Sequence, residues 1–161
     1  MATGSLAALL DTLPQRGSVV WLGSRPQRRA PLRECTTLEL DPVQGVVGDH
    51  YAGRSGKRQV TLIQAEHIEV VSRLLAHEAI PPALLRRNVI IAGINLLALR
   101  QRRFRIGDVV LEGTGACHPC SRMEEALGAG GYNAMRGHGG ITARVLSAGW
   151  IDCGDIVAAA T

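Results

Sequence analysis

The segment GTGACHPCSR, residues 113–122, holds the residue types in this chain that are best suited to chemistry. Cys117 and Cys120 flank His118 and Pro119, after a β-rich run and before a run typical of a helix. A thiol between a strand end and a helix N-terminus lies near backbone N–H donors, which favour the thiolate. Because a thiolate binds soft metals or attacks electrophiles, we expect the chemistry of this protein here.

Four interpretations of this cysteine pair are open. A thioredoxin-like redox pair matches C-x-x-C locally, but no proline follows Cys120 to supply the cis-proline loop known in that fold. Structural zinc needs four ligands, usually in two close pairs, and the chain has one such pair. In the third interpretation the cysteines are simply buried as small hydrophobic residues, which suits Cys35 and Cys153 better than the pair Cys117 and Cys120. The fourth interpretation is a single thiolate that ligates a transition metal or carries sulfur.

The composition of the chain indicates which class of ligand and which cellular compartment to expect. The net charge of +4 comes from 17 arginines and one lysine, Lys57, and only 3% of residues are aromatic. This balance favours an anionic small molecule over nucleic acid, because arginine binds phosphate and carboxylate as a bidentate fork. Pyridoxal phosphate is not expected in this chain alone, since only Lys57, in a Gly-rich loop, could form its Schiff base. No apolar run is long enough to span a bilayer, so we expect a cytoplasmic protein without membrane contact.

Strand signals outnumber helix signals along the chain. We expect strands at 18–22, 35–40 and 58–63 and in NVIIAG, residues 88–93, with one amphipathic helix over 64–76. FRIGDVVLEG and WIDCGDIVAA each place a Gly-Asp turn before a β-branched run, which is typical of small barrels. We therefore predict a mainly β fold with a few helices: one domain over 1–161, with its core at about 17–161 and a short N-terminal helical extension.

Five motifs occur in an order that resembles the MOSC domain, named from the C-terminal domain of molybdenum cofactor sulfurases, and the standalone bacterial type in particular. They are GVVGDHYAG, KRQVTLIQAEH, LLRRNVIIAGINL, FRIGDVVLEGTGACHPCSRM and MRGHGGITARVLSAGWIDCGDIV. The similarity runs from about Gly17 to the C-terminus. It implies a β-barrel like the barrel domain of pyruvate kinase, in agreement with the strand pattern.

The resemblance also implies a cofactor and a reaction. The Pro-Cys cysteine of the family is Cys120 here, which would be a thiolate ligand to molybdenum in the molybdenum cofactor, molybdopterin. Some members reduce small N-hydroxylated bases and amidoximes. This chain has no flavin, haem or iron–sulfur motif, so a separate reductase would donate the electrons.

A non-catalytic carrier of the cofactor, or of a persulfide on Cys120, is the alternative function, and a Cys117/Cys120 redox protein is a third. Many members have no cysteine at the position of Cys117. This thiol could support the metal ligand from beside it, could resolve a persulfide on Cys120, or could be inert.

The phosphate of the pterin predicts arginines or Gly-rich backbone around the site. The candidates that match the family motifs or flank Gly-rich turns are Arg58, Arg86, Arg87, Arg136, Gly139 and Gly140. Asn88 could hydrogen-bond the edge of the pterin, and each arginine could equally form a structural ion pair.

Histidines near neutral pKa could supply the proton for a departing hydroxyl. His50 and His118 are the catalytic candidates, with His138 as a competitor. Asp49 is expected to fix its turn by side-chain hydrogen bonds. His67 and His77 are expected on the surface.

Overall fold

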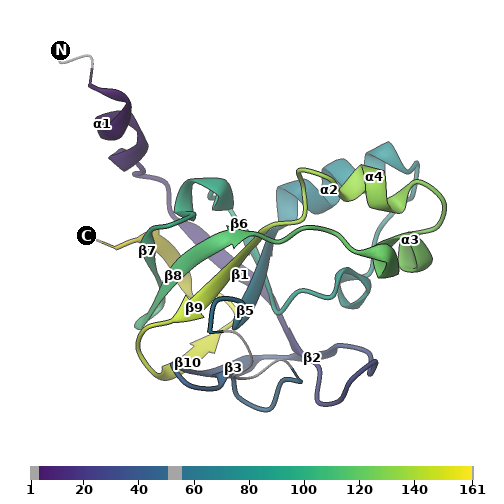
Figure 1. Ribbon diagram of the computed structural model, residues 1–161, viewed down its shortest axis with the longest axis horizontal. Helices are drawn as coiled ribbons and strands as arrows, with labels where there is room; N and C mark the ends of the chain where they lie inside the picture. The colour runs from purple at the N-terminus through teal and green to yellow at the C-terminus, as the bar shows by residue number, and fades with distance from the viewer. Residues whose placement is uncertain (1–3, 51–55, 161) are drawn as a thin grey trace.

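Seven strands of the chain close into a barrel in the computed structural model, which describes residues 4–50 and 56–160 (Figure 1). The sheet runs in the order β11-β7-β8-β9-β5-β6-β1, and pairing of β1 with β11 closes it. Its strands are β1 (Gly17–Ser24), β5 (Val60–Gln64), β6 (Val89–Ala92), β7 (Arg103–Ile106), β8 (Val109–Ala116), β9 (Ile141–Val145) and β11 (Ile156–Ala159). All of these pairs are antiparallel except β5 with β6. The predicted mainly β, barrel-like fold is confirmed.

Alternating side chains fill the barrel. In β7, Phe104 and Ile106 are fully buried while their neighbours are exposed, because successive strand residues point to opposite faces. The two predicted Gly-Asp turns are present: Gly107 (φ 57°) links β7 to β8, and Gly154 (φ 94°) links β10 (Gly149–Asp152) to β11. Such left-handed backbone favours glycine, which explains the repeated motif.

Four further strands among the described residues extend the structure beside the barrel. β2 (Arg33–Cys35) pairs with β1, and β10 pairs with β3 (Thr37–Asp41), which in turn pairs with β4 (Gly45–Val46). Ile151, Leu38 and Leu40 of this small sheet pack into the barrel core. The sheet therefore covers part of the barrel with an apolar face.

A group of helices lies together at one end of the barrel (Figure 1). They are α2 (Ala65–Leu74), α3 (Ser121–Leu127), α4 (Gly131–Met135) and the 3-10 turn η1 (Pro82–Leu85), with a second turn η2 (Leu96–Leu99) above the sheet. A separate apolar cluster holds the helices to β5 and includes Ile63, Leu85, Met123 and Met135. This helical layer therefore packs against β5 and β6.

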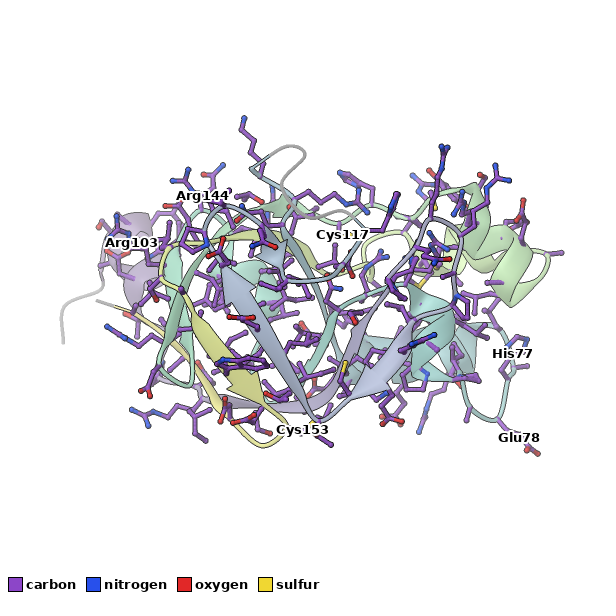
Figure 2. The ribbon with its side chains drawn as sticks, turned by 90° about the horizontal axis from the view of Figure 1, so that it is seen from below. His77, Glu78, Arg103, Cys117, Arg144 and Cys153 are labelled. Carbon is purple, nitrogen blue, oxygen red and sulfur yellow. The ribbon has the colours of Figure 1, made fainter. Side chains whose placement is uncertain are left out.

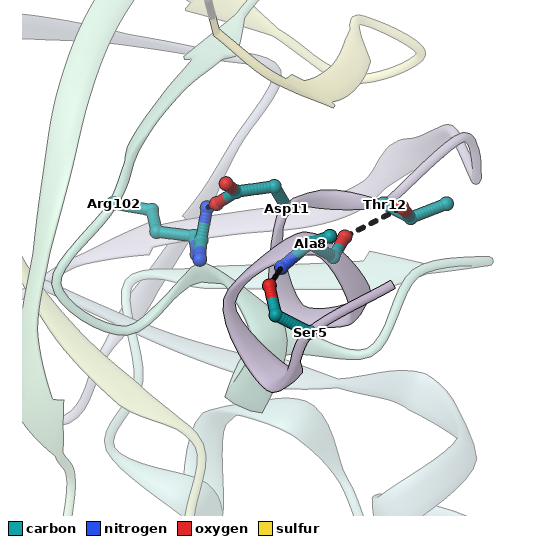
Figure 3. Close-up of polar contacts among 5 residues, drawn as sticks. All are labelled: Ser5, Ala8, Asp11, Thr12 and Arg102. Atoms are coloured by element: carbon teal, nitrogen blue, oxygen red, sulfur yellow. Dashed lines mark hydrogen bonds and ion pairs between the residues drawn. The ribbon is translucent and has the colours of Figure 1, made fainter. Parts of the chain in front are cut away.

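Helix α1 (Leu6–Asp11) projects from the opposite end of the molecule (Figure 1). Ser5 Oγ accepts from the N–H of Ala8 at 3.2 Å, the hydroxyl of Thr12 donates to the Ala8 carbonyl, and Asp11 pairs with Arg102 (Figure 3). Caps and one ion pair thus hold a helix that buries none of its own residues. Among the described residues, no helix is both long and apolar enough to cross a membrane.

Candidate functional site

The cysteine segment lies between a strand and a helix, as predicted. β8 ends at Ala116, α3 begins at Ser121, and Cys120 is the residue that precedes the helix. Cys117 is buried at 2% exposure, whereas Cys120 is exposed. The two thiols therefore differ in access, and Cys120 is the one that a ligand or partner can reach.

The remaining cysteines contradict the expected burial. Cys153 is exposed, and Cys35 is only partly buried, although it packs against the barrel core. Cys35 ends β2, and Cys153 lies in the turn after β10, where its Sγ is 4.0 Å from the Cys35 carbonyl oxygen. Figure 2 shows Cys153 at the edge of the molecule, away from Cys117. Cys117 takes the buried role instead, because the backbone packs closely around it.

Cys120 opens onto a cavity of about 280 Å³ that we call the arginine cavity. Five arginines line it: Arg25, Arg58, Arg86, Arg87 and Arg122. The rest of its lining is Asp49, Gln59, Thr61, Asn88, His118, Cys120 and Ser121. Because Asp49 is the one acidic side chain among the described residues of that lining, the cavity carries a strong positive charge and suits an anionic ligand.

Arg87 is one of two buried cations in the lining of this cavity, at 4% exposure beside 6% for Arg25. Its Nε donates to Gly139 O at 2.8 Å, its Nη1 to Leu85 O at 3.0 Å and its Nη2 to Cys117 O at 3.4 Å. Burial lowers its pKa, and the Cys117 thiol, the next largest influence, raises it. Main-chain carbonyls hold the guanidinium, which ties the cysteine segment to the turn at Gly139.

Hydrogen bonds of Asn88 and Asp49 join the chain segments that line the arginine cavity. Asn88 Oδ1 accepts from both the N–H and the hydroxyl of Thr61 at 3.1 Å, and its Nδ2 donates to Asp49 Oδ2 at 3.0 Å. Asp49 Oδ2 also accepts from the N–H of Arg25 at 3.0 Å. We expected Asp49 to fix its own turn. These two hydrogen bonds of its side chain instead link the residue after β1 to the residue before β6. The Asn88 side chain lines the cavity while it serves this network.

Two of the remaining cofactor candidates pack against the cysteine segment. A Cβ added to Gly139 would meet Cys117 O at 2.2 Å, and one added to Gly140 would meet Leu62 O at 1.8 Å. These glycines allow the backbone to approach β5 and the cysteines closely. Arg136 is exposed, contacts Asn133 at 3.4 Å and, within the described chain, is outside the lining of the arginine cavity.

A second cavity, of about 370 Å³, lies beside the same segment. We define it by Gln64, His67, Asn95, Leu96, Leu97, Arg100, Ala116, Cys117, His118, Pro119, Gly137, Gly139, Gly140 and Ile141. His118 lines both cavities. The segment 117–119 therefore contributes to a cationic cavity and to a less charged one.

The structure places the other histidines as follows. His67 is half-buried, contrary to the expected surface position, and its ring lies edge-on to that of His138 at 5.2 Å between centroids. Burial first, and the charge of His138 second, lower the pKa of His67. His77 is exposed as expected. The N–H of His50 donates to Arg25 O at 2.7 Å, so His50 lies next to a wall of the arginine cavity.

Sequence reasoning missed Arg25 and Arg122. Arg25 directly follows β1 and is buried at 6% exposure, while Arg122 lies in the first turn of α3, two residues after Cys120. The sequence did offer a signal for both arginines as site residues: Arg25 follows a predicted strand, and Arg122 lies close to Cys120. Residues 51–55 of the predicted Gly-rich stretch lie outside the described residues.

Together, the barrel and the cysteine beside five arginines define a class: a β-barrel domain with an accessible thiol at a cationic cavity. The model of the MOSC domain matches residues 44–158, and the chain belongs to this family, which is associated with the molybdenum cofactor.

Solved structures share the fold at low sequence identity. The YuaD protein from Bacillus subtilis is 18% identical, with a TM-score of 0.79 over 91% of this chain and 97% of that one. YiiM from Escherichia coli is 16% identical, with a TM-score of 0.68 over 89% and 70% of the two chains. YiiM from Geobacillus stearothermophilus is 12% identical, with a TM-score of 0.66 over 92% and 76%. No curated protein matches the sequence.

Proposed function

We propose that this protein binds the molybdenum cofactor at Cys120 and the arginine cavity, and that it reduces small N-hydroxylated substrates. The observation that carries the proposal is an exposed thiol at the mouth of a cavity lined by five arginines. Thiolates suit soft transition metals, and arginine forks suit the phosphate of the pterin. The donor set of the site therefore fits this cofactor in both charge and ligand chemistry.

The roles of the cavity residues follow from their positions. Arg58, Arg86 and Arg122 would bind the anionic end of the cofactor, while Arg87 would add charge from a fixed, buried position. Arg58 Nη2 lies 3.8 Å from Cys117 Sγ, so the buried thiol helps to position this arginine. Asn88 and Asp49 would keep the cavity floor in place through their mutual hydrogen bond.

The reaction converts N–OH to N–H and water with two electrons and two protons. When bound, the cofactor would supply the metal centre for electron transfer, and a separate reductase would supply the electrons. His118 would donate a proton to the departing hydroxyl, because it is exposed and lines the cavity that contains Cys120. His50 is the second candidate donor, from its position beside Arg25.

A carrier of cofactor or of sulfur is the second candidate function. The exposure of Cys120 favours it, because a persulfide must be reached by the acceptor protein. The burial of Cys117 favours both single-thiol functions over a redox pair, since thiol–disulfide exchange requires access to the attacked sulfur.

Molybdenum content tests the proposal directly. We expect stoichiometric molybdenum in protein made in cells with intact cofactor synthesis, its loss in Cys120→Ala and its retention in Cys117→Ala. The wild type and Cys117→Ala should also reduce a hydroxylamine compound with an artificial electron donor. Metal without turnover would favour the carrier, and wild-type protein without molybdenum would contradict the proposal.

A further inference from the structure

Cys35 and Cys153 lie side by side, although they are 118 positions apart in the sequence. The Sγ of Cys153 is 4.0 Å from the Cys35 carbonyl oxygen, and the N–H of Cys153 donates to the carbonyl of Thr36, the next residue, at 3.1 Å. Two thiols therefore meet where β2 and β3 approach the turn after β10. The proposed function uses neither of them.

The pairing of β3 with β10 brings the two main chains within reach of a disulfide. Thr37 is opposite Asp152, so Cys153 follows opposite Thr36, one position from Cys35. Facing Cα atoms on adjacent strands are about 4.5–5.5 Å apart, and a Cα one position along is about 6 Å away. A disulfide joins Cα atoms about 4.4–6.8 Å apart, so the strand pairing already supplies the required separation.

Both segments are anchored to the same strand, and both thiols are accessible. Cys35 belongs to β2, which pairs with β1, and the N–H of Gly154 donates to Val19 O of β1 at 2.8 Å. Cys153 is exposed and Cys35 is half-buried. Rotation of the Cys35 side chain toward Cys153 costs only its weak S–H hydrogen bond to Arg33 O, at 3.4 Å. The backbone is thus held in place while the sulfurs can turn toward each other.

From these features we propose that Cys35 and Cys153 form a reversible disulfide when the protein meets a hydroperoxide. The Cys153 thiolate attacks the peroxide: an S–O bond forms, the O–O bond breaks, and the departing oxygen takes up a proton and leaves as water. The Cys35 thiolate then attacks the sulfenic sulfur: the S–S bond forms, the S–O bond breaks, and a second water leaves. Two thiols and one hydrogen peroxide give one disulfide and two waters, and the peroxide gains the two electrons that the sulfurs lose.

The surroundings of Cys153 determine how the reaction depends on pH. Burial is the largest cause that raises the pKa of Cys153, followed by the charges of Glu34, Cys35 and Asp152, while the N–H of Leu22 opposes them. Because the thiolate attacks the peroxide, the rate of disulfide formation should still rise with pH above the ordinary cysteine pKa of about 8.5. A rate that levels off below that value would overturn the assignment of Cys153 as the first nucleophile.

Peptide mapping of the purified full-length protein tests the proposal. Cleavage by trypsin at arginines places Cys35, Cys153 and the pair Cys117 and Cys120 on three different peptides. After treatment with hydrogen peroxide and alkylation of the remaining thiols, we expect the mass of the Cys35 peptide joined to the Cys153 peptide. Dithiothreitol should remove this mass. Oxidation of both cysteines without the joined mass would overturn the proposal.

Cysteine variants identify the partners. Cys35→Ser should abolish the joined peptide and leave Cys153 as a sulfenic acid that dimedone traps. Cys120→Ser is the matched control, because it removes another exposed thiol on a different segment, and it should leave the yield of the joined peptide unchanged. An equal loss of yield in the two variants would show that oxidation begins at Cys120 and would overturn the assignment.

Thermal melting tests whether the native backbone accepts the bond. A disulfide that closes so long a loop constrains the unfolded chain strongly, so the oxidised wild type should melt at least about 5 °C higher than the reduced protein. Peroxide should give no such rise in Cys35→Ser. An unchanged or lower melting temperature of the joined protein would show that the bond distorts the fold and would overturn the proposal. These readouts do not involve molybdenum, so their failure and that of the proposed function are separate results.

Discussion

The two cavities that share His118 are held in shape by different forces. The arginine cavity depends on a buried cation, Arg87, whose guanidinium is hydrogen-bonded to three carbonyl groups. The second cavity depends on close backbone contact at Gly139 and Gly140. Hydrogen bonds therefore hold the frame of the first cavity, and steric contact between backbone segments holds that of the second.

Among the substitutions that test this difference between the two cavities, Gly140→Ala should lower the free energy of unfolding most. In Gly140→Ala the new Cβ would lie 1.8 Å from Leu62 O, at a φ of 86° that alanine also disfavours. We expect a loss of about 4 kcal/mol or more in the free energy of unfolding, measured with urea, because backbone atoms must move.

Gly137→Ala is the matched control for Gly140→Ala. Gly137 has a similar φ of 80°, but nothing lies within 4 Å of an added Cβ. Only the cost of placing alanine in left-handed backbone remains, about 1–2 kcal/mol. Equal losses at the two positions would show that left-handed backbone alone, and not contact with β5, fixes the second cavity.

Removal of the Arg87 guanidinium should have the next largest effect. Arg87→Met keeps much of the side-chain bulk but leaves the carbonyls of Gly139, Leu85 and Cys117 without this donor. We expect a loss of about 2–4 kcal/mol in the free energy of unfolding, read from urea denaturation.

The control for Arg87→Met is Arg136→Met on the exposed end of α4, which should change stability by less than about 0.5 kcal/mol. Arg87→Lys should restore only part of the loss, because an ammonium cannot reproduce the planar fork. Full restoration by lysine would show that charge, and not geometry, holds the cysteine segment.

The barrel was predictable because its signals are local. The Gly-Asp turns at Gly107 and Gly154 and the alternation around Phe104 each determine the structure of a few neighbouring residues. The cysteine segment was predictable for the same reason, since a strand signal and a helix signal flank it directly.

The environment of each side chain was not predictable from the sequence. Cys117 and Cys120 are three residues apart, yet one is buried and the other exposed, because Gly139 and Gly140 return from a distant part of the chain to cover Cys117. Arg136 follows a Gly-rich signal but lies on the surface, while Arg25, from the N-terminal strand, lines the cavity. Long-range packing decided each of these cases.

Titration of His67 should give the smallest effect and sharpen the description of the second cavity. Its pKa is lowered by burial and by His138, against the opposing charge of Glu66, so the folded protein binds its proton less tightly than the unfolded chain. Stability from this group is therefore complete above the ordinary histidine pKa of about 6.5. It decreases as pH falls from there through the lower folded pKa, and then stays constant.

We expect an NMR titration of His67 to give a pKa below the ordinary histidine value. His138→Asn should raise the pKa of His67 toward that value by removing the second cation. His67→Asn should reduce the decrease in melting temperature between neutral and mildly acidic pH. A His67 pKa at the ordinary histidine value would mean that water reaches this imidazole freely, and would contradict a second cavity closed by steric contact.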